Sequence, residues 1–212
     1  METLDQIRQS NATFRPIVAF DFDGTLTCKD SFVAFLAWRA GARRSALGLA
    51  RLAPAAIRYG QDRDRARLKA AAVQEFLRGV TRKTLADDAR RFAADHAGDL
   101  LRPDALKCWN VWRARDARLV VVTASPEILV APFARGLGAE RVIGTRLAFD
   151  AQDRVTGLLD GANCRGPEKI NRLAEVYGAD FQLAAAYGDS DGDREMLARA
   201  EESGLRVFGL RP

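Results

Sequence analysis

The sequence predicts an α/β protein with a doubly wound, Rossmann-like parallel sheet and an inserted helical cap. Three short apolar runs, each followed at once by a polar residue, are typical of buried parallel strands that end in functional loops. Helical patterns separate the later runs, and strands that alternate with helices favour a doubly wound sheet. A long stretch after the first run shows only helical patterns, which predicts a cap built of helices.

The predicted strands are the apolar runs at 16–20, 118–123 and 183–188. The first is continuous, contains β-branched residues and leads directly into Asp21. The second, Arg-Leu-Val-Val-Val-Thr, has the strongest strand pattern. The third is rich in alanine and would suit a helix, except that a Gly-Asp pair stops it at Asp189. Ligands in such sheets bind at the carboxyl ends of the strands, so these ends predict the functional site.

Two helices and a hairpin are predicted between the later strands. In the segment 125–138, Ser125 is expected to cap a helix that starts with proline and ends at a glycine. A second helix is predicted over 167–178, with proline at its start and glycine at its end. Residues 146–149 and 155–158 flank a polar turn and predict a hairpin with a structural role.

The organisation along the chain predicts two parts. Residues 14–30 and 99–212 are expected to form the catalytic α/β core, and residues 31–98, which are rich in arginine, the helical cap. Residues 1–13 form a polar lead-in to which we assign no function.

The composition excludes several classes of protein. The 212 residues are 48% hydrophobic and 29% charged, as in an ordinary folded domain, and no run reaches the ~20 apolar residues of a membrane span. Three scattered cysteines favour neither a disulfide framework nor a zinc site, and the first residues do not resemble a secretory signal, so a cytoplasmic location fits best. The net charge of +5 and the pI of about 9.4 indicate an anionic partner, although arginine-rich composition accounts for part of the bias.

Two carboxylates directly follow the first strand, in the sequence Asp21-Phe22-Asp23-Gly24-Thr25. Residues two apart in such a loop can converge on one site while Phe22 points away, and Gly24 permits a sharp turn. Such a pair can bind a hard cation and leave one oxygen free as a nucleophile. Acidic pairs at strand ends also serve as caps and turns, so this motif needs support from the rest of the chain.

That support comes from a resemblance over about 18–208 to the haloacid dehalogenase-like hydrolase superfamily of aspartate-dependent phosphatases. The segment 21–25 matches the first motif, Asp-x-Asp-Gly-Thr, and 120–123 looks like the second, a strand ending in a hydroxyl. Lys169 resembles the third motif, and the acidic segment 188–193 the fourth. The helical insertion after the first motif is similar to the cap of the phosphoserine phosphatase-like branch.

The resemblance implies a magnesium-dependent mechanism with an aspartyl-phosphate intermediate. Asp21 would be the nucleophile, and Asp23 the general acid and then the general base. Mg²⁺ would be bound by Asp21, the backbone carbonyl of Asp23 and Asp189. Lys169 and Thr123 would stabilise the phosphoryl group. Two further acids of the fourth motif remain: Asp193 is expected to orient a metal-bound water or the lysine, and Asp191 either belongs to the site or caps the next helix.

The substrate is expected to be a phosphomonoester, and two classes stay open. Phosphoserine-specific members have glutamate nine positions after the nucleophile, whereas this sequence has Asp30 there. Asp30, Ala124, Asn163 and Arg165 look more like the branch that includes phosphatidylglycerophosphatases, and we take them as candidate substrate-binding residues. The alternative is a phosphoserine phosphatase or another phosphatase of soluble metabolites.

The first half of the cap combines aromatic and aliphatic residues with arginines, including Arg43, Arg44 and Arg51. This pattern suits peripheral contact with an anionic membrane, for example at the inner face of the cell membrane, or simple packing within the cap. Arg65, Arg67 and Lys69 are interpreted as a charged, solvated helix face rather than as phosphate ligands.

A rival hypothesis of another class is a basic, non-catalytic module that binds RNA or membrane. The filled catalytic positions disfavour it, and a nucleic-acid partner is not expected. His96 is interpreted as an exposed residue without a catalytic role, and Cys164, beside Arg165, could have a lowered pKa but lacks a visible base partner. Trp109 and Trp112 are expected to contribute to packing.

Overall fold

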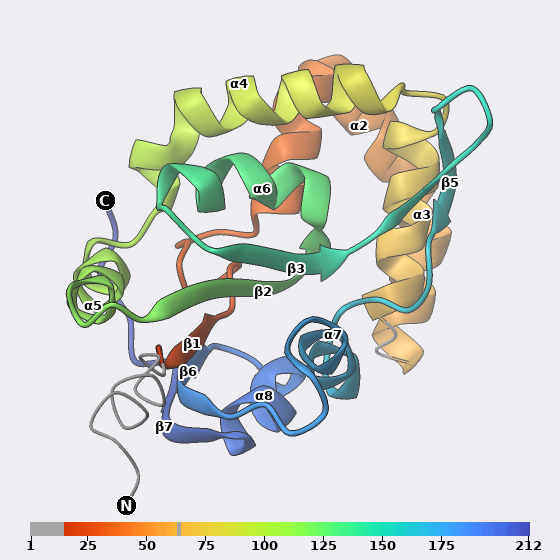
Figure 1. The fold of residues 1–212 in the computed structure, drawn as a ribbon. Helices are drawn as coiled ribbons and strands as arrows, with labels where there is room; N and C mark the ends of the chain where they lie inside the picture. Colours follow the sequence, from red (N-terminus) through yellow and green to blue (C-terminus); the bar gives the residue numbers. More distant parts are fainter. Residues whose placement is uncertain (1–14, 63–64) are drawn as a thin grey trace, which may run out of the picture.

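The computed structural model describes residues 15–62 and 65–212, so the predicted lead-in at 1–13 lies outside the described part. The centre is a five-stranded, fully parallel sheet in the order β3-β2-β1-β6-β7 (Figure 1). Its strands are β1 (Ile17–Phe20), β2 (Arg118–Pro126), β3 (Arg141–Thr145), β6 (Leu183–Gly188) and β7 (Ala200–Leu205). The predicted fold class is confirmed, and the structure adds β3 and β7 to the predicted strands.

Helices follow the strands and also fill the region between β1 and β2. They are α2 (Ser31–Asp62), α3 (Arg65–Leu77), α4 (Arg82–Leu100), α5 (Pro103–Ala114), α6 (Glu127–Gly136), α7 (Pro167–Tyr177) and α8 (Arg194–Ala198). A short 3-10 helix, η1 (Asp191–Asp193), precedes α8, and the predicted hairpin forms from β4 (Leu147–Phe149) and β5 (Val155–Leu159). None of the described helices has an apolar stretch long enough to cross a bilayer.

The sheet separates two hydrophobic cores because successive side chains of a strand point to opposite faces. Val18 and Phe20 of β1 belong to the core covered by α4, α5 and α6, whereas Ile17 and Ala19 belong to the core covered by α7 and α8. Figure 1 shows α4 and α6 on one side of the sheet and α7 and α8 on the other. Both faces are therefore buried, as the continuous apolar strands predict.

Two tryptophans of α5 fix this helix against the core. Trp109 is buried beside Phe20, and its indole N–H donates to the carbonyl of Leu137 at 3.0 Å. The indole N–H of Trp112 donates to the hydroxyl of Tyr187 at 2.9 Å. Both indoles thus bury their rings and still satisfy their donors, which confirms the predicted packing role.

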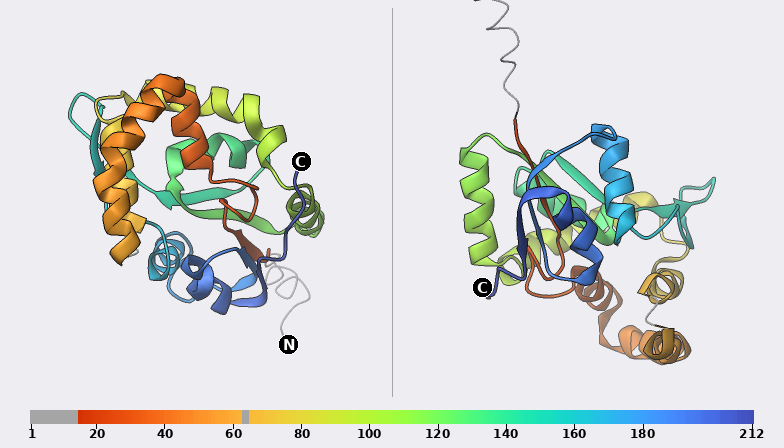
Figure 2. Two further views of the ribbon diagram at one scale, coloured as in Figure 1. Left: turned by 180° about the vertical axis from the view of Figure 1, so that it is seen from behind. Right: turned by 90° about the horizontal axis from the view of Figure 1, so that it is seen from below.

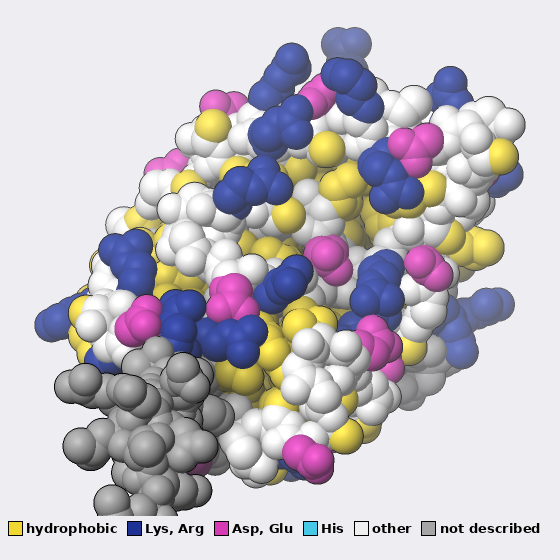
Figure 3. All heavy atoms as spheres, viewed as in Figure 1, with side chains coloured by type: hydrophobic (Ala, Val, Ile, Leu, Met, Phe, Trp, Pro, Cys, Tyr) yellow, Lys and Arg dark blue, Asp and Glu magenta, His cyan; other side chains and the backbone are white. Residues whose placement is uncertain are grey.

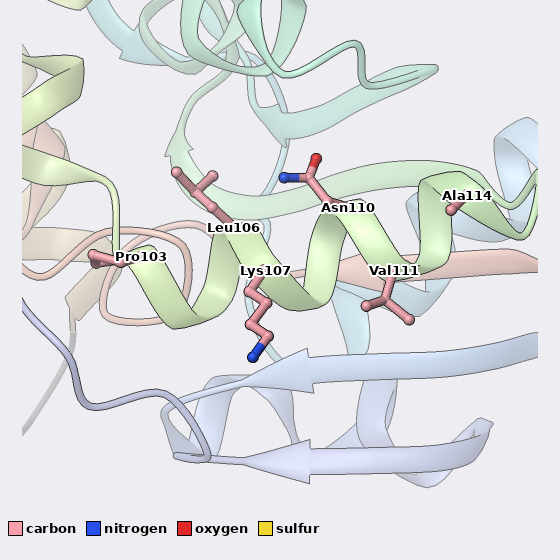
Figure 4. A pocket seen from close by; sticks show the side chains of 6 residues that line it. All are labelled: Pro103, Leu106, Lys107, Asn110, Val111 and Ala114. Carbon is pink, nitrogen blue, oxygen red and sulfur yellow. The ribbon is translucent and has the colours of Figure 1, made fainter.

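The outer face of α5 carries an open hollow (Figure 4). Its lining comes from this helix alone and consists of Pro103, Leu106, Lys107, Asn110, Val111 and Ala114. No residue predicted for the site contributes to it.

The chain leaves the core and returns to it through two segments that lie side by side. The amide of Cys28 donates to the carbonyl of Leu100 at 2.8 Å, and the amide of Arg102 to the carbonyl of Leu26 at 2.8 Å. Between them, α2 packs on α3, while α4 packs along α6. Figure 2 shows α2 and α3 together, away from the sheet. The division into a cap at 31–98 and a core stays our proposal, with α4 as the helix that joins the two.

The β4–β5 hairpin follows β3 of the sheet and contacts the end of α3. The amide of Gly79 donates to the carbonyl of Val155 at 2.8 Å, and the amide of Val155 donates to the carbonyl of Val80 at 2.9 Å. These bonds hold the end of α3 against β5, in keeping with the structural role that we predict for the hairpin.

Candidate active site

The candidate site lies where the strand order of the sheet reverses. The chain adds β2 and β3 on one side of β1 and β6 and β7 on the other, so the crevice opens between β1 and β6. Asp21 and Asp23 follow β1, Thr123 lies in the last part of β2, and Asp189 follows β6. Four of the predicted residues thus come from three neighbouring strand ends.

Lys169, on the first turn of α7, lies at the centre of this group. Its ammonium group donates to Oδ1 of Asp21 at 2.6 Å, to Oδ1 of Asp193 at 2.6 Å and to the carbonyl of Val122 at 2.7 Å. The lysine is 1% exposed. All three hydrogens of the ammonium group therefore have acceptors, and its position is fixed by the protein alone.

Burial and charge shift the pKa values of these groups in different directions. Burial raises the pKa of Asp21 to about 7, although Lys169 opposes this effect. Burial alone would lower the pKa of Lys169, but the two adjacent carboxylates outweigh it and raise the pKa above its ordinary value. For Asp193, the lysine and the hydrogen bonds from Ser190 outweigh burial and lower the pKa. Lys169 and Asp193 therefore form a charged pair next to Asp21.

The turn after β6 orients Asp193. Its Oδ2 accepts from the amide of Asp189 at 3.2 Å and from the amide and hydroxyl of Ser190, both at 3.0 Å. Ser190 caps η1, whereas Asp191 is exposed and pairs with Arg194 at 2.9 Å. Asp191 is also absent from the group of carboxylates formed by Asp21, Asp189 and Asp193. The predicted capping role of Asp191 is wrong, because Ser190 occupies the cap position and Asp191 makes a surface ion pair instead.

Three carboxylates are grouped closely enough to hold one cation. Oxygen atoms of Asp21, Asp189 and Asp193 lie within 4.8 Å of one another. The predicted metal ligands Asp21 and Asp189 are both in this group, and Asp193 is the third carboxylate. The contribution predicted for Asp23 is its backbone carbonyl rather than its carboxylate. Gly24 makes the grouping possible: its φ is +85°, and a Cβ atom there would lie 2.2 Å from Oδ2 of Asp189. The oxygen-only donor set suits a hard cation such as Mg²⁺.

The carboxyl group of Asp23 is held at both oxygens. Oδ1 accepts from the amide of Ser31 at 2.6 Å, and Oδ2 accepts from the hydroxyl of Ser125 at 2.5 Å. Burial and the charge of Asp30 raise the pKa of Asp23, which favours the protonated form that a general acid needs. Phe22 points away and packs on Phe133, as predicted.

Ser125 is a site residue that the sequence interpretation placed wrongly. We expected it to cap a helix, but α6 begins at Glu127 after Pro126 and has no side-chain cap. The hydroxyl of Ser125 instead reaches Asp23, and its amide donates to Oγ1 of Thr123 at 3.0 Å. β2 continues through Pro126, and this extended backbone directs the serine into the site rather than along the helix.

Lys69 of α3 is a second correction, because its ammonium group is not on a solvated helix face. It donates to the carbonyl of Ala124 in the core, and burial lowers its pKa although Asp23 and Asp30 oppose this. Arg67 is exposed, and the side chain of Arg65 lies outside the described part. The structure thus brings one cation of the cap into the site.

The predicted substrate-binding residues occupy different positions around the site. Asp30 is exposed, and its Oδ1 accepts from the amide of Val33 at 2.9 Å, as a residue that caps α2 would. Oδ1 of Asn163 lies 2.9 Å from the hydroxyl oxygen of Thr145. Arg165 is half-buried and packs against Gly192. A Cβ atom on Gly192 would lie 2.6 Å from Nε of Arg165.

Two minor expectations are also corrected. His96 is half-buried rather than exposed, and its ring lies 4.9 Å from the ring of Phe92. Burial raises the pKa of the Cys164 thiol to about 11, opposite to the lowering that Arg165 suggested. All three cysteines lie in the described part and are unpaired.

The comparisons with known proteins agree with this geometry. Protein CicA of Caulobacter vibrioides is 59% identical over 196 residues, which cover 92% of this chain and 88% of CicA. A phosphoserine phosphatase of Halobacterium salinarum is 31% identical over 192 residues, covering 87% of this chain and 82% of that protein. A crystal structure of a Bordetella pertussis protein of unknown function has a TM-score of 0.76 at 23% identity, covers 90% of this chain and 89% of its own, and shows a shared fold.

The model of one protein family covers most of the chain. It matches residues 18–198, which include nearly all of the sheet except β7, the candidate site residues and the helices between β1 and β2. The expected family and the expected hydrolase class are thereby confirmed. The chain belongs to the haloacid dehalogenase-like hydrolase family.

Proposed function

We propose that this protein is a Mg²⁺-dependent phosphomonoester phosphatase that works through an aspartyl-phosphate on Asp21. The observation that carries the proposal is the buried Lys169, which donates to Asp21 and Asp193 at 2.6 Å each, at the strand ends where Thr123 and Asp189 also lie. A buried cation beside a carboxylate nucleophile offsets the charge of an approaching phosphate, and this effect is strong where water is excluded.

The residues suggest the order of bond changes. An oxygen of Asp21 forms the new bond to phosphorus, and the bond to the leaving alkoxide breaks. Asp23, whose pKa is raised by burial and by Asp30, donates a proton to the alkoxide. A water then attacks the phosphorus, Asp23 accepts its proton, and the Asp21 carboxylate is released with inorganic phosphate. Thr123, whose Oγ1 accepts from Ser125, keeps its own hydrogen to donate to a phosphoryl oxygen.

The carboxylates of Asp21 and Asp189 and the carbonyl of Asp23 would hold Mg²⁺, with Asp193 beside them. The ion would supply positive charge that reduces the repulsion between the nucleophile and the phosphate. The close grouping of oxygen donors supports this assignment.

The test is Mg²⁺-dependent phosphate release by the wild type and by Asp21→Asn, with Asp116→Asn as the matched control. Asp116 is exposed and pairs with Arg15, so its change should leave turnover intact. Asp21→Asn should abolish release and the acid-stable phosphoenzyme, while the fold remains. Retained turnover in Asp21→Asn would refute the mechanism.

A lipid phosphate such as phosphatidylglycerophosphate is the finer proposal for the substrate. Its support is the outer face of α2, where Leu47 and Ile57 are 60% and 66% exposed and lie among the exposed Arg43 and Arg58. Arg43 and Leu47 are one helical turn apart, and Ile57 and Arg58 lie further along the same helix. An apolar stripe flanked by arginines suits an anionic membrane surface, to which the cytoplasmic protein would bind peripherally.

The structure also selects the arginines to test. Arg44 and Arg51 pair with Glu75 at 2.6 and 3.2 Å, so they contribute to packing between α2 and α3. Arg43→Glu with Arg58→Glu should instead weaken sedimentation with phosphatidylglycerol vesicles and leave the fold unchanged. Equal sedimentation of this variant and the wild type would remove the reason for a lipid substrate.

A soluble phosphometabolite such as phosphoserine is the second candidate. Lys69, half-buried near Asp23 and Asp30, offers a cation to a substrate group beyond the phosphate, and the Halobacterium salinarum relative is a phosphoserine phosphatase. Phosphate release from phosphatidylglycerophosphate in micelles and from phosphoserine, measured side by side, separates the two candidates.

On the face of the molecule seen in Figure 3, the charge distribution gives little support to the non-catalytic RNA-binding hypothesis. Figure 3 shows Lys and Arg side chains on this face interleaved with Asp and Glu rather than gathered in one patch. RNA binding that falls with salt and is unaffected by Asp21→Asn would favour that hypothesis.

A further inference from the structure

We propose that Ser125 is a positioning residue that holds the acid-base carboxyl of Asp23 and the phosphoryl-binding hydroxyl of Thr123 in one arrangement. The inference rests on the proposed phosphatase function and extends it to a residue outside the four motifs. Ser125 is 2% exposed and makes one hydrogen bond to each of these two groups, through its hydroxyl and its amide.

The first contact fixes the plane of the Asp23 carboxyl. The hydroxyl of Ser125 lies 2.5 Å from Oδ2, and the amide of Ser31 lies 2.6 Å from Oδ1. A carboxyl held at both oxygens cannot rotate freely about its terminal torsion, which is otherwise broad. The remaining position on the carboxyl, where a proton is given or taken, therefore keeps one direction. Without the Ser125 hydroxyl, the Asp23 carboxyl would lose its hydrogen bond at Oδ2 and keep its contacts with Ser31.

The second contact fixes the direction of the Thr123 hydroxyl. Oγ1 accepts the amide hydrogen of Ser125 at 3.0 Å, which occupies one of its lone pairs. The hydroxyl hydrogen is then free to point toward a phosphoryl oxygen. The serine thus links the group that would bind the phosphate to the group that would protonate the leaving oxygen.

Ser125 is itself held by the core. The carbonyl of the preceding Ala124 accepts from the hydroxyl of Thr145 at 2.7 Å and from Lys69. β3 approaches so closely that a Cβ atom on Gly144 would lie 3.0 Å from the carbonyl oxygen of Ser125. Because these contacts involve protein groups only, Ser125 is in place before any substrate binds.

The test compares two substrates that differ in how much they need a general acid. An alkyl phosphate leaves as a basic alkoxide and needs a proton, whereas p-nitrophenyl phosphate leaves as a stable phenolate. Ser125→Ala should lower kcat/KM for the alkyl phosphate by about 10- to 100-fold, since general acids contribute ~10²–10⁴-fold and small misplacements are costly. For p-nitrophenyl phosphate the loss should be less than about 3-fold on the same grounds. Ser125→Thr, which keeps the hydroxyl, should recover most of the kcat/KM that Ser125→Ala loses for the alkyl phosphate.

The controls separate this inference from the proposed function. Ser203→Ala makes the same change at an exposed site on β7 and should leave both substrates unaffected. If the wild type releases no phosphate from either substrate, the proposed function fails and the inference falls with it. The positioning role is refuted if the wild type is active and Ser125→Ala has the same fold-loss of kcat/KM for both substrates. It is also refuted if Ser125→Ala has the wild-type kcat/KM for both. Should Ser125→Ala not fold, Ser125→Cys, with a similar shape and a weak donor, takes its place under the same criteria.

Discussion

Gly24→Ala should disrupt the proposed cation site while leaving the fold largely intact. A Cβ atom at position 24 would lie 2.2 Å from Oδ2 of Asp189, whereas ordinary contacts begin at 3.4 Å. The carboxylate of Asp189 must therefore move by about 1.2 Å, the difference between these distances. Asp189 is only half-buried, so the side chain can move without disturbing the sheet.

A displacement of this size is large compared with the tolerance of the ion. Mg²⁺ requires near-octahedral geometry with oxygen ligands at ~2.0–2.1 Å. We expect the affinity for Mg²⁺ to fall by at least about 10-fold, since even the loss of a group that only orients a ligand costs ~10–100-fold. The free energy of unfolding should fall by about 1–2 kcal/mol, from the φ of +85° that an alanine must adopt.

Gly79→Ala is the matched control. The φ of Gly79 is +79°, but no atom lies within 4 Å of the added Cβ. Gly79→Ala therefore has the same kind of backbone strain as Gly24→Ala but displaces no neighbouring side chain. Isothermal titration with Mg²⁺ and urea unfolding should show equal losses of stability in the two variants and a loss of affinity in Gly24→Ala alone. The reasoning would be refuted if Gly24→Ala bound Mg²⁺ with the wild-type affinity. It would also be refuted if Gly79→Ala lost as much affinity for Mg²⁺ as Gly24→Ala.

Three further predictions concern stability and reactivity. Lys169→Met leaves Asp21 and Asp193 buried without their cation, so urea unfolding should show a loss of about 3–5 kcal/mol. This loss should grow as pH rises, because Lys169 lowers the pKa of both Asp21 and Asp193, so its removal raises both pKa values in the folded variant and makes their ionisation more destabilising. Cys164, buried with a pKa of about 11, should resist iodoacetamide at pH ~8 until the protein unfolds. Trp112→Phe loses the bond to Tyr187 and should cost about 1–3 kcal/mol in the same unfolding assay.

The strands that could be predicted are those buried on both faces. β1 and β2 are continuous apolar runs, because helices cover both sides of them. β7 could not be recognised, since it is an edge strand in which Glu201, Glu202 and Ser203 are exposed. Its register is set by pairing with β6, a contact that local sequence does not encode.

The candidate site residues that the structure brings together could be selected from the sequence because each lies near the end of an element with a clear pattern. Lys69 and Ser125 could not, because their functional contacts are distant in sequence. Lys69 reaches Ala124 across 55 positions, and Ser125 reaches Asp23 across 102. A lysine in a charged helix and a serine before Pro126 have common local explanations, so only the packing of α3 and β2 around the site distinguishes their roles.

The balance of charge in the site gives an independent reason to expect a divalent cation. Four carboxylates lie there, those of Asp21, Asp23, Asp189 and Asp193, whereas Lys169 and Lys69 supply two positive charges. Burial, together with the neighbouring carboxylates, raises the pKa of Asp21 to about 7 and that of Asp23 above its usual range, which favours their neutral forms. A neutral Asp21 is a poor nucleophile, while a protonated Asp23 is the form that a general acid needs. A divalent cation next to Asp21 and Asp189 would ionise the nucleophile and leave Asp23, held by Ser125 and Ser31, to keep its proton.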